Sequence, residues 1–311
     1  FLINKYTGFG LFHYFNILEY LSFFMLNVIN PIKIKYFINL IRLNKPIGFM
    51  LLMWPCWFAL AEIVQKKFQL INWYIYFFIG AVLMRSAGCI INDLVDQKID
   101  SKIQRTALRP IAAKKISNLN AIIFLIILLT IGLLILLQFK FETILAGLIC
   151  TPLIVMYPFM KRITFWPQLF LGIVFNWGII ICSIEFFETI TREFFIFYLA
   201  CVFWTIGYDT IYAFQDLKDD IKNEIKSTAV LFKEKGRYLV LASYTLMSLL
   251  IGYLSFLKTN KLITMFFLLV IIIFIFFNLL RWDHKSESSS GKIFRQNNVF
   301  GAMIFLYLLS F

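Results

Sequence analysis

The amino-acid sequence predicts an all-α, multi-pass membrane protein. Of its 311 residues, 61% are hydrophobic and 15% are charged, whereas a soluble domain is about half apolar and about a quarter charged. The mean hydropathy is +0.81, so the chain has more apolar side chains than one soluble core could bury. The long apolar runs show no alternation with a period of two, which favours helices over a membrane β-barrel. This composition excludes a soluble enzyme, a disordered chain and a disulfide-rich secreted module.

Nine segments are long and apolar enough for a transmembrane helix, which requires about 20 mostly apolar residues. In chain order they are 47–64, 73–91, 119–137, 143–160, 168–187, 194–213, 238–257, 262–280 and a last one from 298 to the end. Residues 1–37 are predicted to be an N-terminal extension, to which the sequence assigns no role. Residues 38–311 are predicted to form one membrane domain.

Lys and Arg residues alternate between the two sides of these nine segments. The side that we call the basic side carries four Lys and Arg residues in 33–45, six in 98–115, two at 161–162, six in 218–237 and four in 281–295. The opposite side carries six. Because basic residues collect in cytoplasmic loops, the basic side is expected to face the cytoplasm, or the matrix of an organelle. The same rule explains the net charge of +13 without nucleic acid, since no base-stacking motif or basic helix is present.

The five cysteines are widely spaced in apolar stretches, and no CxxC pair occurs among them. They are therefore predicted to be small core residues, not disulfide partners or zinc ligands. These residues are Cys56, Cys89, Cys150, Cys182 and Cys201.

Two acidic motifs lie on the basic side of the protein. The first, NDLVDQKID, occupies residues 92–100 directly after the second predicted span. If the helix continues, Asp93, Asp96 and Asp100 share one of its faces. Three carboxylates on one face repel one another unless a cation lies among them.

The second motif, DTIYAFQDLKDD, ends the sixth predicted span at residues 209–220. On a helix its acidic residues and one tyrosine again share a face. These are Asp209, Tyr212, Asp216, Asp219 and Asp220.

The two motifs match each other in register. NDLVD at 92–96 corresponds to QDLKD at 215–219, four spans later. This repetition predicts an internal duplication of a four-helix unit, which brings both acidic faces to one shared cavity. A solvated charged loop would explain one such run, but two matched runs at the membrane boundary indicate a functional site.

Carboxylates in this arrangement suit Mg²⁺, which prefers oxygen ligands and commonly joins one or two carboxylates to a phosphate group. Two opposed acidic faces could hold Mg²⁺ with a diphosphate between them, and the metal would neutralise a departing diphosphate. Neighbouring basic residues could contact phosphate, although loops on the basic side carry such residues for topological reasons alone. They are Lys98, Lys102, Arg105, Arg109, Lys161, Arg162 and Lys226.

Several stretches together carry a resemblance to a known family. They are RLNKPIG at 42–48, WP at 54–55, RSAGCIINDLVDQKID at 85–100, RTALRP at 105–110, YPFMKRIT at 157–164, PQ at 167–168, the second motif at 209–220, and KSTA at 226–229. On these residues the chain resembles the UbiA superfamily of intramembrane aromatic prenyltransferases. Within it, the chain is most similar to the 4-hydroxybenzoate polyprenyltransferases of ubiquinone biosynthesis.

The resemblance implies nine helices around a central cavity open to the membrane, in a bacterial or mitochondrial inner membrane. It implies that Mg²⁺ holds a polyprenyl diphosphate, and that the ring carbon ortho to the hydroxyl of 4-hydroxybenzoate attacks the allylic cation. The acidic motifs would lie on the cytoplasmic or matrix side.

The resemblance also implies roles for individual residues. The residues that it implies first as ligands of the metal and the diphosphate are Asn92, Asp96, Asp216 and Asp220. Asp93, Asp100, Asp209 and Asp219 are implied as supporting members of this group. Arg42 and Arg162 are the candidates for the carboxylate of the aromatic acid, and the rings of Tyr212 and Phe214 could stabilise the cation. Asp96, Asp216, Asp220 and Arg162 are the expected catalytic group. The expected substrate-binding group is Arg42, Lys98, Arg105, Arg109, Lys161, Lys226 and Tyr212.

Other functions remain open at this stage. Related enzymes use other acceptors, such as naphthoates, homogentisate or haem. A cation-coupled transporter would carry isolated acids in broken helices near the midplane, whereas these acids lie at span ends beside many bases. A purely structural subunit would not require the duplicated motif. The length of the prenyl chain and any protein partners are not readable from the sequence.

Overall fold

The computed structural model describes residues 31–64, 71–103, 105–258 and 262–310. Within these ranges the chain is helical and contains no strand. The helices are α2 (Pro31–Leu40), α3 (Ile47–Val64), α4 (Ile71–Asp100), α5 (Asn118–Leu136), α6 (Phe141–Ile163), α7 (Pro167–Phe175), α8 (Trp177–Phe187), α9 (Arg192–Ala213), α10 (Leu217–Lys222), α11 (Thr228–Phe232), the short 3₁₀ turn η1 (Lys233–Lys235), α12 (Gly236–Lys258), α13 (Leu262–Leu280) and α14 (Glu287–Leu308).

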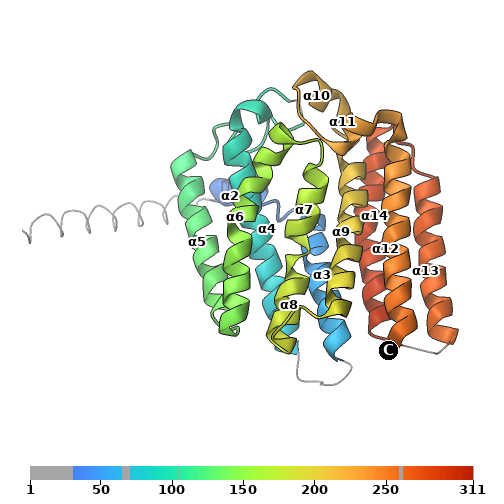
Figure 1. The fold of residues 1–311 in the computed structure, drawn as a ribbon. Coiled ribbons are helices and arrows are strands. Elements are labelled where there is room, and N and C mark those ends of the chain that lie inside the picture. Colours follow the sequence, from blue (N-terminus) through green and yellow to red (C-terminus); the bar gives the residue numbers. More distant parts are fainter. Residues whose placement is uncertain (1–30, 65–70, 104, 259–261, 311) are drawn as a thin grey trace, which may run out of the picture.

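The long helices run roughly antiparallel to their chain neighbours and form one bundle (Figure 1). Helices α5 and α6 lie at one flank and α12 and α13 at the opposite flank. Helices α10 and α11 cover one end of the bundle, the end at which α9 stops. Both acidic motifs therefore lie at this end, as their positions relative to the spans predict.

Seven helical segments within the described residues are long and apolar enough to cross a membrane. Helices α7 and α8 together form one of them, and α11 with α12 forms another. Helix α3 is apolar but shorter, and α14 carries many polar residues in its first half. The all-helical membrane fold is thus confirmed, while the count of nine spans stays a prediction. Helix α2 runs across the predicted boundary between residues 37 and 38, and residues 1–30 lie outside the described part.

Helix α9 forms the centre of the bundle. Most of its residues are buried, whereas α13 buries only about one residue per turn and exposes most of its other apolar side chains. Helix α9 is thus an inner helix, whereas α13 has the exposed apolar surface of a helix that faces lipid. At Gly207 of α9 a Cβ atom would lie 2.6 Å from the ring of Tyr244 in α12, so glycine permits the close approach of these two helices.

Polar side chains define where several helices begin. The hydroxyl oxygens of Ser117, Thr191, Ser227 and Ser286 each accept a hydrogen bond from a backbone N–H in the first turn of the following helix. Such N-caps stabilise a helix by about 1 kcal/mol. All five cysteines are buried and free, which confirms their prediction as core residues.

Candidate active site

The described helices surround a cavity of about 1260 Å³. Residues of both acidic motifs line it, together with basic residues from four loops or helix ends. Those predicted site residues are Arg42, Asn92, Asp100, Arg105, Arg109, Lys161, Asp209, Tyr212, Asp216, Asp220 and Lys226. The others, Asp93, Asp96, Lys98, Arg162 and Asp219, do not belong to the wall formed by the described residues. The structure therefore brings the two motifs to one cavity but turns part of each motif away from it.

Asp93 and Asp100 are held by arginines from two different segments. Arg42 Nη2 donates to Asp93 Oδ1 at 2.6 Å, and Arg109 Nη1 donates to Asp93 Oδ1 at 3.2 Å and to Asp100 Oδ2 at 2.7 Å. Asp93 is only 2% exposed. These bonds fasten the segment before α3 and the loop after α4 to the end of α4.

Arg42 forms its ion pair with Asp93 from a backbone conformation that is unusual for an L-residue. Its φ is +55°, a left-handed value that costs an L-residue about 1 to 2 kcal/mol. Glycine would relieve that strain but would lose the ion pair with Asp93. The local backbone strain is thus offset by a charge-assisted hydrogen bond in a partly buried place.

Asp96 is fully buried and pairs with both basic residues at the end of α6. Lys161 Nζ is in direct contact with its carboxylate, and Arg162 Nη2 donates to Oδ1 at 3.1 Å. Lys161 also lines the cavity. Asp96 therefore contributes to the cavity indirectly, because its carboxylate holds Lys161 in position at the wall.

Asp216 of the second motif is clamped by Arg105, which follows the first motif. Arg105 Nε and Nη2 donate to the two carboxylate oxygens of Asp216, both at 2.5 Å, and Nη1 donates to the hydroxyl of Tyr212 at 3.1 Å. The guanidinium carbon also lies 5.5 Å from the ring centroid of Tyr212. This contact joins the loop after the first acidic motif directly to the second motif.

Asp220 lies in α10, outside the membrane helices. Burial, together with the charges of Asp216 and Asp219, raises the pKa of its carboxyl to about 7, against the lowering effect of Lys161 and Arg105. Burial is the largest of these effects and disfavours the ionised carboxylate, so a cation bound beside Asp220 would stabilise the ionised form.

Arg85 in the middle of α4 is a polar wall residue that the sequence analysis did not single out. Its Nε is buried and has no hydrogen-bond partner among the described residues, and its guanidinium lies 5.7 Å from the ring of Phe175. Gly48 makes room for it, since a Cβ there would lie 2.6 Å from Arg85 Nε. A charged residue inside an apolar run marks a functional site by default, and that signal in segment 73–91 could have identified Arg85.

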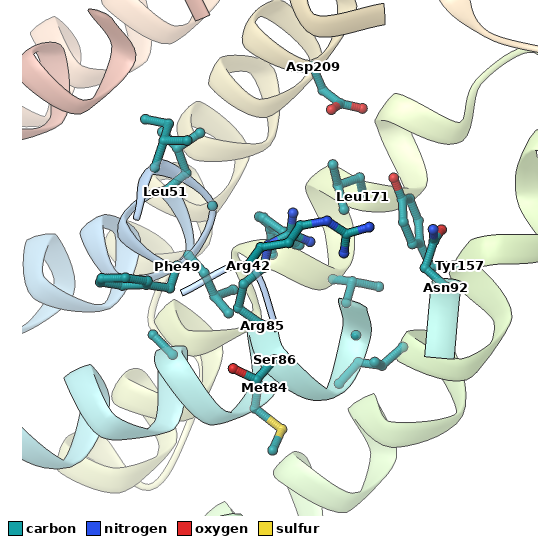
Figure 2. A pocket seen from close by; sticks show the side chains of 18 of the residues that line it. Arg42, Phe49, Leu51, Met84, Arg85, Ser86, Asn92, Tyr157, Leu171 and Asp209 are labelled. Atoms are coloured by element: carbon teal, nitrogen blue, oxygen red, sulfur yellow. The ribbon is translucent and has the colours of Figure 1, made fainter. Parts of the chain in front are cut away.

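Arg85 shares its part of the cavity with other polar residues. Figure 2 shows the side chains of Arg42, Arg85, Asn92, Tyr157 and Asp209 around one space. They come from the segment before α3 and from α4, α6 and α9. Within this group Arg85 lies deeper along α4 than the first acidic motif, because it precedes Asn92 by about two helical turns.

Within the described residues, no group of three or more His, Cys, Asp or Glu side chains is close enough to hold a metal ion. Four carboxylates of the motifs pair with arginine or lysine of the protein instead, namely those of Asp93, Asp96, Asp100 and Asp216. The chemistry of the wall nevertheless fits Mg²⁺, since five of the predicted metal ligands, each with a side-chain oxygen, line one cavity. They are Asn92, Asp100, Asp209, Asp216 and Asp220.

The fold and the cavity together define an integral membrane protein with a site for an amphiphilic, phosphate-bearing molecule. Acidic and basic groups gather at one end of the cavity, and the remaining wall is mostly apolar. The chain belongs to the UbiA prenyltransferase family, whose model matches residues 52–309.

Curated relatives support this membership over most of the chain. The 4-hydroxybenzoate octaprenyltransferase of Pseudoalteromonas translucida (strain TAC 125) is 36% identical over 285 residues, which cover 90% of this chain and 96% of that protein. The mitochondrial 4-hydroxybenzoate polyprenyltransferase of Drosophila melanogaster is 44% identical over 206 residues, which cover 65% of this chain and 52% of that protein. The match thus spans about half the length of the fly relative.

Solved structures show the same fold. The apo structure of a UbiA homolog from Aeropyrum pernix K1 has a TM-score of 0.67 at 20% identity and covers 85% of this chain and 97% of its own. A UbiA homolog from Archaeoglobus fulgidus bound to GPP and Mg²⁺ has a TM-score of 0.66 at 16% identity, with 89% and 100% covered.

Proposed function

We propose that this protein transfers a polyprenyl group from polyprenyl diphosphate to the ring carbon ortho to the hydroxyl of 4-hydroxybenzoate, in ubiquinone biosynthesis. The observation that carries the proposal is the single cavity at which both acidic motifs and several basic residues meet an apolar wall. The names of the curated relatives support the acceptor. The bacterial and mitochondrial relatives support an inner membrane of a bacterium or mitochondrion, and the distribution of Lys and Arg supports a site on its cytoplasmic or matrix side.

The diphosphate belongs at the acidic end of the cavity. Mg²⁺ held there by Asn92, Asp100, Asp216 and Asp220 would supply charge neutralisation for the departing diphosphate, and the Mg²⁺-bound Archaeoglobus homolog supports the choice of metal. Phosphate oxygens accept hydrogen bonds from a group of basic wall residues. These are Arg105, Arg109, Lys161 and Lys226.

The predicted site residues away from the wall take supporting roles. Asp96 and Arg162 position Lys161, and Asp93 positions Arg42 and Arg109. Lys98 and Asp219 lie at the same end and contribute to the electrostatic field at the entrance.

The aromatic acid belongs deeper in the cavity, beside Arg85. We assign its carboxylate to Arg85 because Arg42 and Arg162 are already paired with Asp93 and Asp96. The allylic carbon–oxygen bond breaks and leaves its electron pair on the diphosphate, and a carbon–carbon bond forms at the ring. The ring proton passes to a carboxylate oxygen of Asp209, and the ring of Tyr212 faces the cation.

A product assay tests the function. Membranes that contain the protein are incubated with Mg²⁺, octaprenyl diphosphate and radiolabelled 4-hydroxybenzoate, and label in the lipid fraction is counted. Label is expected with Mg²⁺, none with EDTA, and full recovery when Mg²⁺ is restored. Parallel reactions with dihydroxynaphthoate and homogentisate serve as controls for the acceptor. Activity in EDTA would contradict the carboxylate site, and label from another acceptor alone would overturn the assignment of 4-hydroxybenzoate.

Arg85→Gln is expected to raise the KM for 4-hydroxybenzoate by about 10- to 100-fold, the value of a lost charge-assisted hydrogen bond. The KM for the diphosphate should stay the same, because the diphosphate is held at the C-terminal end of α4, about two helical turns or more from Arg85. The methyl ester of 4-hydroxybenzoate has no carboxylate, so wild type and variant should use it equally. Arg42→Gln is the comparison: if it raises the KM for the acid and Arg85→Gln does not, the carboxylate belongs to Arg42.

A further inference from the structure

Helix α14 contributes one face to the cavity, although it belongs to neither acidic motif. Its residues on the wall are Gly291, Phe294, Arg295 and Asn298. Their spacing of three and four residues places them on one face of the helix. The ring centroid of Phe294 lies 4.8 Å from that of Tyr212 in the second motif, and Trp54 Nε1 in α3 donates to Asn298 Oδ1 at 2.8 Å. These contacts fix this face of α14 against α9 and α3.

The guanidinium group of Arg295 lies back along α14, toward the second acidic motif. A Cβ atom at Gly291, one helical turn earlier, would lie 3.4 Å from Arg295 Nη1 and 3.0 Å from Gln215 Oε1. The guanidinium group and the side-chain oxygen of Gln215 therefore lie beside the same point. Because Gln215 directly precedes Asp216, Arg295 is located at the acidic end of the cavity.

Arg295 differs from most basic residues at this end in its lack of a carboxylate partner. Four of the others contact a carboxylate, namely Arg42, Arg105, Arg109 and Lys161. None of the ion pairs among the described residues includes Arg295. Lys45 and Lys226 share this property and also line the wall, but a lysine lacks the planar fork of donors that arginine has. The charge of Arg295 is thus available to an added anion.

Membrane topology alone does not explain the position of Arg295. Lys292 and Arg295 both belong to the basic side, where such residues collect in any membrane protein. Lys292 is exposed and does not line the cavity, whereas Arg295 does so one helical turn later. A basic residue that served only orientation would need no place on the cavity wall.

The anion that suits Arg295 is a phosphate group. Arginine donates two parallel N–H bonds to phosphate oxygens, and such charge-assisted pairs are among the stronger hydrogen bonds. The neighbouring Gln215 and Asp216 lie where the proposed function places Mg²⁺ and the diphosphate. The carboxylate of the aromatic acid is assigned to Arg85, which lies about two helical turns deeper along α4 than Asn92.

We propose that Arg295 is a binding residue for the diphosphate of the donor, contributed by the last helix. Its guanidinium group donates to phosphate oxygens from the side of the second motif. It also stabilises the negative charge that the diphosphate gains when the allylic carbon–oxygen bond breaks. The proposal rests on the proposed function for the identity of the donor, and it adds a residue outside the acidic motifs and the basic loops beside them.

The test measures the binding of inorganic pyrophosphate and of geranyl diphosphate, each with Mg²⁺ and without the aromatic acid. Calorimetry is performed in detergent free of phospholipid on wild type, Arg295→Gln and Lys292→Gln. The matched control is Lys292→Gln, which removes the same charge from the same helix at a position off the wall. Because neither residue forms an ion pair within the described chain, both variants should unfold at the wild-type temperature. Arg295→Met, which keeps the apolar stem, replaces Arg295→Gln if that variant does not fold.

Arg295→Gln is expected to weaken both ligands by about tenfold or more, the value of a lost charge-assisted hydrogen bond. Lys292→Gln should weaken neither. Pyrophosphate has no prenyl group, so an equal loss for both ligands locates the contact at the diphosphate. The KM for 4-hydroxybenzoate should stay the same in both variants, because Arg295 is not assigned to the aromatic acid.

A phospholipid headgroup offers the same phosphate chemistry, so a second experiment distinguishes the two sources. Each variant is reconstituted in phosphatidylglycerol nanodiscs, and the lipid that remains bound after extraction into detergent is counted by mass spectrometry. Unchanged binding of pyrophosphate to Arg295→Gln would overturn the proposal. A loss of bound phosphatidylglycerol would then assign Arg295 to lipid, and a raised KM for 4-hydroxybenzoate would assign it to the acid.

Failure of the proposed function would give a different result. A wild-type protein that binds neither pyrophosphate nor geranyl diphosphate would contradict the proposed function itself. A wild-type protein that binds both, with the same affinity as Arg295→Gln, would contradict only the role of Arg295. The two failures are therefore distinguishable.

Discussion

Asp216→Asn is expected to lower kcat by about a thousandfold, the upper range for the loss of one group that stabilises charge in a transition state. Asparagine preserves the shape of the side chain and one oxygen, but it removes the negative charge that Mg²⁺ requires. It also leaves Arg105 without the carboxylate that both its Nε and Nη2 contact. The measurement is the initial rate of label transfer into lipid at saturating substrates.

The matched control is Glu287→Gln, which makes the same change of charge at the same end of the bundle. The Glu287 carboxylate is exposed, lies 3.8 Å from Lys218 Nζ and does not line the cavity. Exposed ion pairs contribute little to stability, so this variant should have the wild-type rate. If Asp216→Asn retained a rate close to that of wild type, Asp216 would have no part in holding the metal or the diphosphate.

Asp96→Ala is expected to abolish turnover and to lower the free energy of unfolding by about 3 kcal/mol. The Asp96 carboxylate is fully buried, and its removal leaves Lys161 and Arg162 near each other without the anion that separates them. Lys161 is also predicted to lose its position at the cavity. Thermal or denaturant unfolding in detergent measures the first effect, and the label-transfer assay measures the second.

The double variant Asp96→Ala/Lys161→Ala separates these two effects. It removes one of the unpaired cations, so part of the stability should return while activity stays absent. Wild-type stability in Asp96→Ala would show that the ion pairs do not hold the ends of α4 and α6 together. Wild-type activity would exclude Asp96 from the site.

The helices of this protein are largely predictable from the sequence, because the transfer of an apolar run into lipid depends on local composition alone. The predicted span 73–91 corresponds to the longer helix α4, which continues to Asp100 and carries the first motif on its last turns. The predicted span 168–187 is divided into α7 and α8 at Asn176, whose side-chain Nδ2 donates to Gly172 O and to Thr205 Oγ1. That break depends on a neighbouring helix, so hydropathy could not reveal it.

The duplicated motifs also predicted that two acidic segments meet at one end of the bundle, and the cavity contains both. Helical spacing could not predict which acids face the cavity. Asp93, Asp96 and Asp100 share a face in sequence, yet only Asp100 lines the wall. The rotation of α4 is set by the helices packed against it, and a rotation of one residue exchanges an exposed carboxylate for a buried one.

The sequence by itself determined the all-helical membrane fold, the end of the bundle at which the basic loops gather and the two acidic motifs. Only the tertiary structure decided the ion pairs, since Arg42 contacts Asp93 and Arg105 contacts Asp216 across 51 and 111 residues of chain. It also decided that Arg85 faces the cavity. Hydropathy and helical period depend on neighbours within a few residues, whereas pairing and empty volume depend on how separate helices pack.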